Sequence, residues 1–316
     1  MTAADVINGD ARWATLVGDV RETLRGVPDG CAQTCVTSPP YFGLRDYGNA
    51  AQIGQETTPR EFVDALVAVM RDVRRVLADD GTLWLNIGDS YSQQGNGYKP
   101  KDLLGIPWRL AFALQDDGWY LRSDIVWAKP NPMPESVTDR PTRAHEYVFL
   151  LTKRARYFYD ADAIRERASS DFGRGATGRG SQGSALAVGC NGRQPQQDHS
   201  GWMGGDGETR NARDVWTITP EPFAEAHFAT MPPELARRCI LAGSRKGDVV
   251  LDPFGGAATT ALVALQHGRR ALLCELNPEY VEIQRRRLAD FTADTSSPVR
   301  VEAPEWGALF GAATKP

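Results

Sequence analysis

Cysteine is scarce in this sequence, and it contains no long apolar run. The five cysteines form no Cys-x-x-Cys pair and no dense framework, so they indicate neither a zinc site nor a disulfide scaffold. We expect reduced, mostly buried thiols at Cys31, Cys35, Cys190, Cys239 and Cys274. No run of 18 or more apolar residues occurs, and no basic start precedes an apolar stretch near the N-terminus. The sequence therefore predicts a cytoplasmic protein without a metal centre.

An excess of positive charge is also missing. The formal net charge is −4 and the pI is about 5.7, which argues against a protein that coats nucleic acid through bulk positive charge. One basic cleft in an otherwise acidic surface remains compatible with these totals. The chain has 316 residues, of which 41% are hydrophobic, so it can bury one large core, or one core plus a small module.

Short apolar runs alternate with amphipathic stretches, which is the pattern of strands and helices in an α/β sheet. Thr58 to Glu61 has the form of a capping box with proline at the first helical position. Apolar residues then recur at helical spacing, and we expect Asp80 and Gly81 to stop this helix before a buried strand at 82–87. Further helices are expected at 107–115, from 231 to about 242, from 258 and from 278, and strands at 35–37, 123–127, 147–151, 248–252 and 270–274.

The composition changes sharply after Ala168. Residues 169–207 are crowded with Gly, Ser, Gln and Arg and have almost no apolar periodicity, which predicts a mobile loop or an insertion. We therefore expect a globular domain in two halves, 1–151 and 223–291, separated by a partly flexible region at 152–222. Residues 292–316 are predicted to be a C-terminal tail.

The segment from Val249 to Gly256 reads as a strand that runs into a glycine turn and opens a helix, and the next strand ends at Glu275. Glycines let a backbone approach a ligand closely, and an acidic side chain about 20 residues later can bind a ribose diol. The turn lacks the Gly-x-Gly-x-x-Gly of dinucleotide enzymes and instead places Asp252 and Phe254 at the strand end. This set suits a ligand with a cationic sulfonium and an adenosine. A tight turn of any α/β protein is the alternative.

The segment from Thr37 to Tyr41, Thr-Ser-Pro-Pro-Tyr, follows a short apolar strand. Consecutive prolines remove two backbone donors, which leaves the carbonyl groups of Ser38 and Pro39 free to face a cavity. An exocyclic amine is a poor nucleophile because its lone pair is delocalised into the ring. Oxygen atoms that accept its hydrogens would draw the nitrogen toward sp³ geometry and expose the lone pair for attack on a methyl group. Tyr41 would stack on an extruded base.

Both motifs resemble those of amino-group DNA methyltransferases. Asp252 to Gly256 with Thr259 and Thr260 is similar to the S-adenosylmethionine motif, although this chain has Ala257-Ala258 where the family usually has a small residue and then glycine. The order of the motifs, catalytic first and cofactor last, resembles the circularly permuted β group, as do the segments 124–134 and 139–147. The resemblance covers about residues 7–168 and 211–291. It implies a Rossmann-like α/β fold, S-adenosylmethionine as cofactor and double-stranded DNA as partner.

The residue roles follow from these motifs. The resemblance implies a catalytic set of Ser38, Pro39, Pro40 and Tyr41, and a cofactor-binding set of Asp19, Thr37, His227, Phe228, Asp252, Pro253, Phe254, Gly255, Gly256, Thr259, Glu275 and Asn277. Basic or polar residues on loops beside strand ends are suited to phosphate or base contacts, and we expect DNA binding by Arg45, Tyr47, Lys129, Arg140, Arg143, His145, Arg210 and Arg213. Target recognition is assigned to residues 152–222.

Several alternatives stay open. In the family a serine start of the catalytic motif goes mostly with cytosine N4 and an aspartate start mostly with adenine N6, so we expect cytosine N4 and keep adenine N6 as the alternative. Cytosine C5 methylation is disfavoured because no Pro-Cys pair is present. An RNA or protein amide methyltransferase is a further alternative, and a non-catalytic DNA-binding or dinucleotide-binding protein another. The sequence leaves open whether a cognate restriction endonuclease or a defence system is a partner, and whether the chain forms a homodimer.

Overall fold

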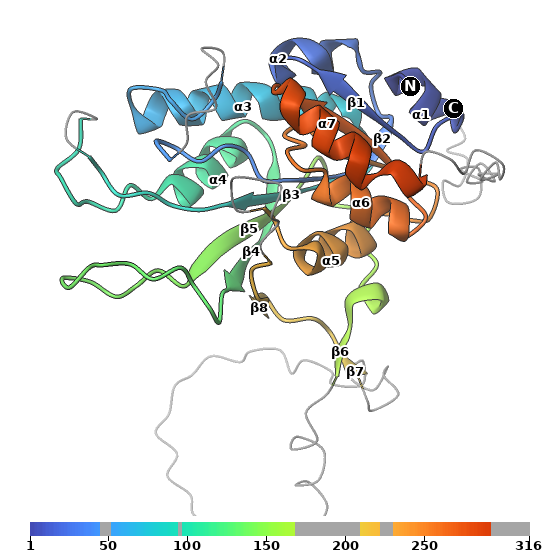
Figure 1. The fold of residues 1–316 in the computed structure, drawn as a ribbon. Coiled ribbons are helices and arrows are strands. Elements are labelled where there is room, and N and C mark those ends of the chain that lie inside the picture. The colour runs from blue at the N-terminus through green and yellow to red at the C-terminus, as the bar shows by residue number, and fades with distance from the viewer. Residues whose placement is uncertain (45–51, 94–96, 168–208, 222–229, 292–316) are drawn as a thin grey trace, which may run out of the picture. The chain divides into compact units, whose positions relative to one another are not determined.

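The computed structural model describes residues 1–44, 52–93, 97–167, 209–221 and 230–291. Among these residues, eight strands form one sheet in the order β1-β10-β9-β2-β3-β5-β4-β8 (Figure 1). Neighbouring strands are parallel, except that β5 runs antiparallel to both β3 and β4. The strands are β1 (Trp13–Val17), β2 (Ala32–Thr37), β3 (Leu77–Ile87), β4 (Tyr120–Ala128), β5 (His145–Thr152), β8 (Val215–Thr217), β9 (Val249–Asp252) and β10 (Arg270–Glu275).

The helices of the described residues cover both faces of this sheet. They are α1 (Ala3–Asn8), α2 (Val20–Thr23), α3 (Pro59–Val76), α4 (Ile106–Asp116), α5 (Pro233–Gly243), α6 (Thr259–Gln266) and α7 (Pro278–Arg287), with short 3₁₀ turns at Leu24–Gly26, Asp162–Ile164 and Ala289–Phe291. On one face, Phe62 and Leu66 of α3 and Leu110 of α4 share a hydrophobic core with Leu83 and Phe149 of the sheet. On the other face, α5 packs on β2 and β3, and α6 packs on β9 and β10 (Figure 1).

The strand order confirms the predicted mixed α/β fold with permuted connections. The last two strands of the described chain, β9 and β10, lie between β1 and β2, which are the first two. Starting at β9, the strand order continues through β10 and β1 in one direction and through β2 and β3 in the other. This reversal leaves a crevice at the carboxyl ends of the strands on either side, which is where open α/β sheets bind ligands.

The helix that begins after Thr58 is shorter than the sequence predicts. It ends at Val76, and Leu77 already has extended backbone angles, with φ −68° and ψ 142°. Leu77 pairs with Ala32 of β2, so the following residues belong to β3. The expectation that Gly81 stops the helix is wrong, because Gly81 lies inside β3, where an added Cβ would approach two backbone carbonyl oxygens to 2.9 Å. Pairing between strands overrides the local helical spacing here.

The chain divides into two compact units. One contains Met1–Asp160 together with the described residues from Asp214 onward, and the other is Ala161–Arg213. In the second unit, the described residues form a two-stranded antiparallel ladder of β6 (Glu166–Arg167) and β7 (Thr209–Arg210). The predicted insertion at 169–207 and the predicted tail at 292–316 lie outside the described residues.

Two further findings concern the cysteines and the length of the apolar helices. Four cysteines are described and all are free thiols; Cys35, Cys239 and Cys274 are buried, and Cys31 is partly buried. Among the described helices, none is both long and apolar enough to cross a bilayer.

Candidate active site

A cavity of about 960 Å³ lies at the carboxyl ends of the central strands. Its walls come from the segments that follow β1, β2, β4, β9 and β10, and from β3 and β5. It brings together most of the residues that the sequence analysis assigned to catalysis and cofactor binding: Asp19, Ser38, Pro39, Pro40, Tyr41, Asp252, Pro253, Phe254, Gly255, Gly256, Thr259, Glu275 and Asn277. Lys129, which was assigned to DNA, lies in the same wall.

Asp252 is the buried carboxylate at the end of β9. Only 3% of the residue is exposed. The hydroxyl of Thr37 donates a hydrogen bond of 2.7 Å to Oδ1, and the backbone N–H of Phe254 donates to the same oxygen at 3.1 Å. Burial raises the pKa of Asp252 to about 6, against the opposing effect of these hydrogen bonds. Thr37 itself is fully buried, so it acts on the cavity through Asp252.

Glu275 occupies the equivalent place at the end of β10. Its two carboxylate oxygens accept hydrogen bonds from the backbone N–H groups of Gly256, at 2.7 Å, and Asn277, at 2.8 Å. Burial raises the pKa of Glu275 to about 7, and the nearby charge of Asp252 contributes to this rise. The two backbone donors fix the carboxylate between the glycine turn and the start of α7.

The glycine turn fits the predicted cofactor. A Cβ at Gly255 would approach Leu273 Cβ to 3.1 Å and the carbonyl oxygen of Cys274 to 3.2 Å, so any side chain there would move the turn away from β10 by a few tenths of an ångström. Gly256 has φ +46°, in the left-handed region. Among the described residues, no basic side chain forms an ion pair with Asp252, and a cationic sulfonium would complement this buried carboxylate. The residues present therefore suit S-adenosylmethionine.

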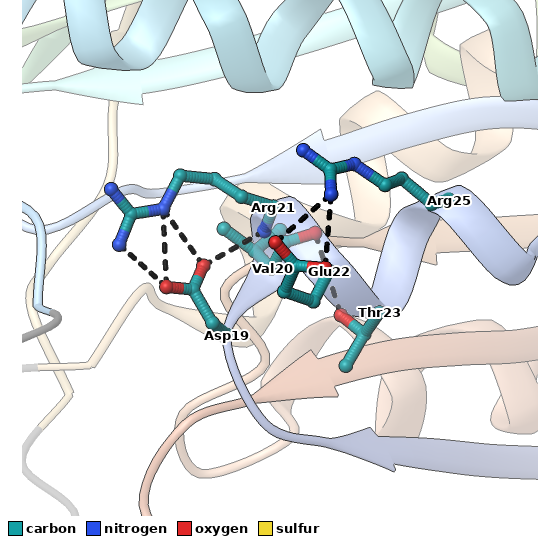
Figure 2. A network of polar contacts seen from close by, with 6 residues as sticks. All are labelled: Asp19, Val20, Arg21, Glu22, Thr23 and Arg25. Carbon is teal, nitrogen blue, oxygen red and sulfur yellow. Dashed lines mark hydrogen bonds and ion pairs between the residues drawn. The ribbon is translucent and has the colours of Figure 1, made fainter.

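Asp19 lies in the cavity wall but already has a cationic partner. Its carboxylate caps α2 by accepting the backbone N–H of Arg21 at 2.9 Å, and it also pairs with the guanidinium of the same residue. Figure 2 shows the two side chains turned toward each other, beside a separate pair of Glu22 with Arg25. The hydrogen bond from the Arg21 side chain holds the pKa of Asp19 below its usual value. A cofactor contact by Asp19 stays a prediction.

The predicted catalytic segment, Ser38–Tyr41, follows β2 directly, and Tyr41 connects it to a polar cluster. The Tyr41 hydroxyl donates a hydrogen bond of 2.6 Å to Glu146 Oε2, and the Ser38 hydroxyl lies 3.4 Å from the same phenol oxygen. Asn86 Nδ2 donates to Glu146 Oε2 at 3.1 Å, and Lys129 forms an ion pair with the other carboxylate oxygen. All five residues line the cavity.

Sequence reasoning assigned no role to Asn86 or Glu146. A signal for Asn86 was present, because it is the single polar side chain between Leu83 and Ile87, and a polar residue inside a buried strand needs a partner. Glu146 lies within the segment 139–147 that resembles the family, next to His145, which was chosen instead.

The other residues assigned to DNA binding do not line the cavity. Arg140 pairs with Glu135 at 2.5 Å and lies 4.0 Å from the centre of the Tyr91 ring, and Arg143 lies 5.0 Å from the same centre. His145 packs edge-on against Tyr147. In the second unit, Arg210 and Arg213 both pair with Glu166, at 3.5 and 2.9 Å. The remaining assigned residues, Arg45, Tyr47, His227 and Phe228, lie outside the described residues.

Comparison with known proteins decides the family. Residues 32–286 match the N6_N4_Mtase family model, described as DNA methylase. The chain belongs to the DNA methylase family. The type II methyltransferase M.Cfr9I of Citrobacter freundii is 47% identical over 293 residues, which cover 86% of each chain.

Solved structures agree with this assignment. The S-adenosylmethionine complex of TTHA0409, a putative DNA modification methylase from Thermus thermophilus, is 27% identical and matches with a TM-score of 0.57 over 90% of this chain and 95% of that chain. The PvuII cytosine-N4-specific DNA methyltransferase shares the fold, with a TM-score of 0.63, 21% identity and coverage of 88% and 86%. This methylase is therefore a DNA amino-methyltransferase of the N6/N4 family that depends on S-adenosylmethionine, as the sequence predicts, and its relative M.Cfr9I is a type II enzyme.

Proposed function

We propose that this methylase transfers the methyl group to N4 of a cytosine that is flipped out of duplex DNA. The observation that carries the proposal is the meeting of Ser38–Tyr41 with Asp252 and Glu275 in one cavity. A base that reaches the first set lies next to a cofactor held by the second. The serine at the start of the catalytic segment supports cytosine N4 over adenine N6.

Each part of the cavity has a defined task in this proposal. Asp252 and Glu275 hold the sulfonium and ribose ends of the cofactor, and the bound S-adenosylmethionine supplies the methyl group. The Ser38 hydroxyl and the Pro39 carbonyl accept hydrogens of the exocyclic amine, which frees the nitrogen lone pair. The Tyr41 ring stacks on the extruded base. The nitrogen bonds to the methyl group as the methyl–sulfur bond breaks, S-adenosylhomocysteine leaves, and the methylated nitrogen releases one proton to solvent.

We also propose that basic loops outside the cavity hold the duplex. Arg140 and Arg143 lie on the proline-rich connection between β4 and β5, which starts from the cavity wall at Lys129 and Asn131. Guanidinium groups in these positions suit phosphate contacts. Target recognition is assigned to residues 152–222. On binding, Arg210 and Arg213 would leave their ion pairs with Glu166 and contact DNA instead. A restriction endonuclease with the same target sequence is the proposed cellular partner, as expected of a type II enzyme.

The experiment that tests the target base is direct. Purified protein is incubated with S-adenosylmethionine and duplex DNA of mixed sequence, and the DNA is digested to nucleosides for mass spectrometry. The variant Asp252→Ala serves as the control, because it removes the carboxylate proposed for the cofactor. We expect N4-methylcytosine in the wild-type sample alone.

Two other outcomes are informative. N6-methyladenine would overturn the choice of cytosine and retain the assigned cavity, since both amines need the same acceptors. No methylated nucleoside on diverse DNA would contradict the proposal as a whole and direct the same assay to RNA.

A further inference from the structure

The polar cluster around Glu146 holds Tyr41 from its hydroxyl end. Glu146 lies on β5, opposite Trp127 of β4, and its side chain is 14% exposed. Oε2 accepts two hydrogen bonds, from the Tyr41 hydroxyl at 2.6 Å and from Asn86 Nδ2 at 3.1 Å. Oε1 pairs with Lys129. Tyr41 is thus attached to a carboxylate that is itself fixed from two sides.

Gly88 restricts the same ring along its edge. A Cβ added at Gly88 would lie 2.7 Å from Tyr41 Cε2, closer than real Cβ contacts, and 3.2 Å from Cδ2, which is a tight contact. The same Cβ would lie 3.5 Å from Glu146 Cγ. The Tyr41 ring therefore rests directly on the backbone after β3, in a position that the hydroxyl contact and this backbone define together.

The ion pair has an energetic cost that a purely structural role does not require. A carboxylate and an ammonium group with 14% and 20% side-chain exposure lose much of their hydration, which their attraction offsets only in part. The Lys129 ammonium also lies 4.3 Å from the centre of the Trp127 ring, which stabilises the cation. Both groups line the cavity, where their arrangement can serve the bound base.

We propose that Glu146 is a positioning residue that sets the orientation of the Tyr41 ring before the target base arrives, with Lys129 and Asn86 holding its carboxylate in place. This inference rests on the proposed function, since it assigns Tyr41 to the stacking of an extruded base. A ring that is fixed in advance loses no rotational freedom when the base stacks on it, and misplacement of groups by about 1 Å can cost about 100-fold in rate. Lys129 then acts through Glu146 and contacts no phosphate.

A double-mutant cycle tests the proposal. We expect Glu146→Ala and Tyr41→Phe each to lower the single-turnover methylation rate about 10- to 100-fold, with the dissociation constant for S-adenosylmethionine changed less than about 2-fold. Once Tyr41 has lost its hydroxyl, Glu146 no longer forms a hydrogen bond with it, so the double variant should be no slower than the slower single variant by more than about 2-fold. Glu282→Ala, which removes an exposed carboxylate paired with Arg285, is the matched control and should leave the rate unchanged.

The outcomes separate this inference from the function on which it rests. Losses that multiply in the double variant would overturn the positioning role while wild-type methylation of DNA stands. A weakened cofactor affinity in Glu146→Ala that accounts for its lost rate would overturn it as well. If the wild-type protein methylates no DNA, the proposed function fails and the inference fails with it, whereas N6-methyladenine as product leaves the cycle fully interpretable.

Discussion

Ala258 is a residue with an unfavourable backbone conformation. Its φ of +62° and ψ of +32° lie in the left-handed region, where it precedes the first turn of α6 and is fully buried. A non-glycine residue there costs about 1–2 kcal/mol relative to glycine. By the resemblance described above, the family usually has glycine at this position, and this chain forms the same turn with an alanine.

The cost at Ala258 can be measured against a matched position. Ala261 is equally buried but lies inside α6, so Ala258→Gly and Ala261→Gly lose the same methyl group and gain the same freedom in the unfolded chain. We expect Ala258→Gly to be less destabilising by about 1–2 kcal/mol, measured by urea unfolding. Equal losses at the two positions would show that the turn tolerates the methyl group without strain.

If Glu275 and Asp252 hold the cofactor as proposed, cofactor binding should be sensitive to pH. The pKa of Glu275 is raised to about 7 and that of Asp252 to about 6, so both carboxyl groups of the unliganded protein take up protons as pH falls through this range. A cation and a ribose diol need the ionised forms. Affinity for S-adenosylmethionine should therefore be constant above about pH 8 and fall about 10-fold or more by pH 6, with protons released on binding.

Calorimetry at pH 6 and pH 8, in buffers of different ionisation enthalpy, measures both effects. Glu275→Gln should bind more weakly at pH 8 and lose most of the dependence near pH 7. The stability of the unliganded protein has the opposite sign: because the folded state binds more protons than the unfolded state between about pH 4 and 7, its free energy of unfolding should decrease as pH rises through this window. A flat affinity between pH 6 and 8 would refute the assignment of these carboxylates to the cofactor.

At the scale of elements, the C-terminal end of α5 is in close contact with β2 and β3 at Gly243. A Cβ at Gly243 would lie 2.6 Å from the hydroxyl oxygens of Thr34 and Thr82 and 2.8 Å from Trp84 Nε1. We expect Gly243→Ala to lower the free energy of unfolding by about 1–3 kcal/mol, as overpacking does. Gly26→Ala is the control, because nothing lies within 4 Å of its added Cβ and its φ is not positive. Similar unfolding midpoints for the two variants would contradict this close packing.

The elements also show which parts of the site and of the fold could be predicted from the sequence. The glycine turn at 252–256 and the segment Ser38–Tyr41 were predictable because the residues of each stand side by side in the chain. The contact of Tyr41 with Glu146 spans 105 positions and exists only because β5 turns back antiparallel against β3. No local pattern encodes that pairing, and a second long-range pairing, of β3 with β2, shortened the predicted helix before Leu77.

At the scale of the whole molecule, the permuted order takes the proposed base contacts and the proposed cofactor contacts from opposite ends of the chain. Ser38 and Tyr41 come from the first 44 residues and Asp252 and Glu275 from beyond residue 248, and β9 meets β2 in the sheet through the pairs Thr34 with Val250 and Cys35 with Leu251. The hydrogen bond from Thr37 to Asp252 joins the two motifs directly. One cavity therefore has two chemically distinct walls, which should be separable by substitution.

Tyr41→Ala and Asp252→Ala test this division of labour. Tyr41→Ala removes the proposed base contact and should lower turnover about 100-fold or more, with the dissociation constant for S-adenosylmethionine within about 3-fold of the wild type. Asp252→Ala removes the buried carboxylate proposed for the sulfonium and should abolish cofactor binding measured by calorimetry, and turnover with it. Because Thr37 would lose its acceptor in Asp252→Ala, Asp252→Asn is measured beside it, since its amide oxygen can accept the same hydrogen bond while the charge is removed. Equal losses of binding and turnover in the Tyr41 and Asp252 variants would mean that the two walls act as one site.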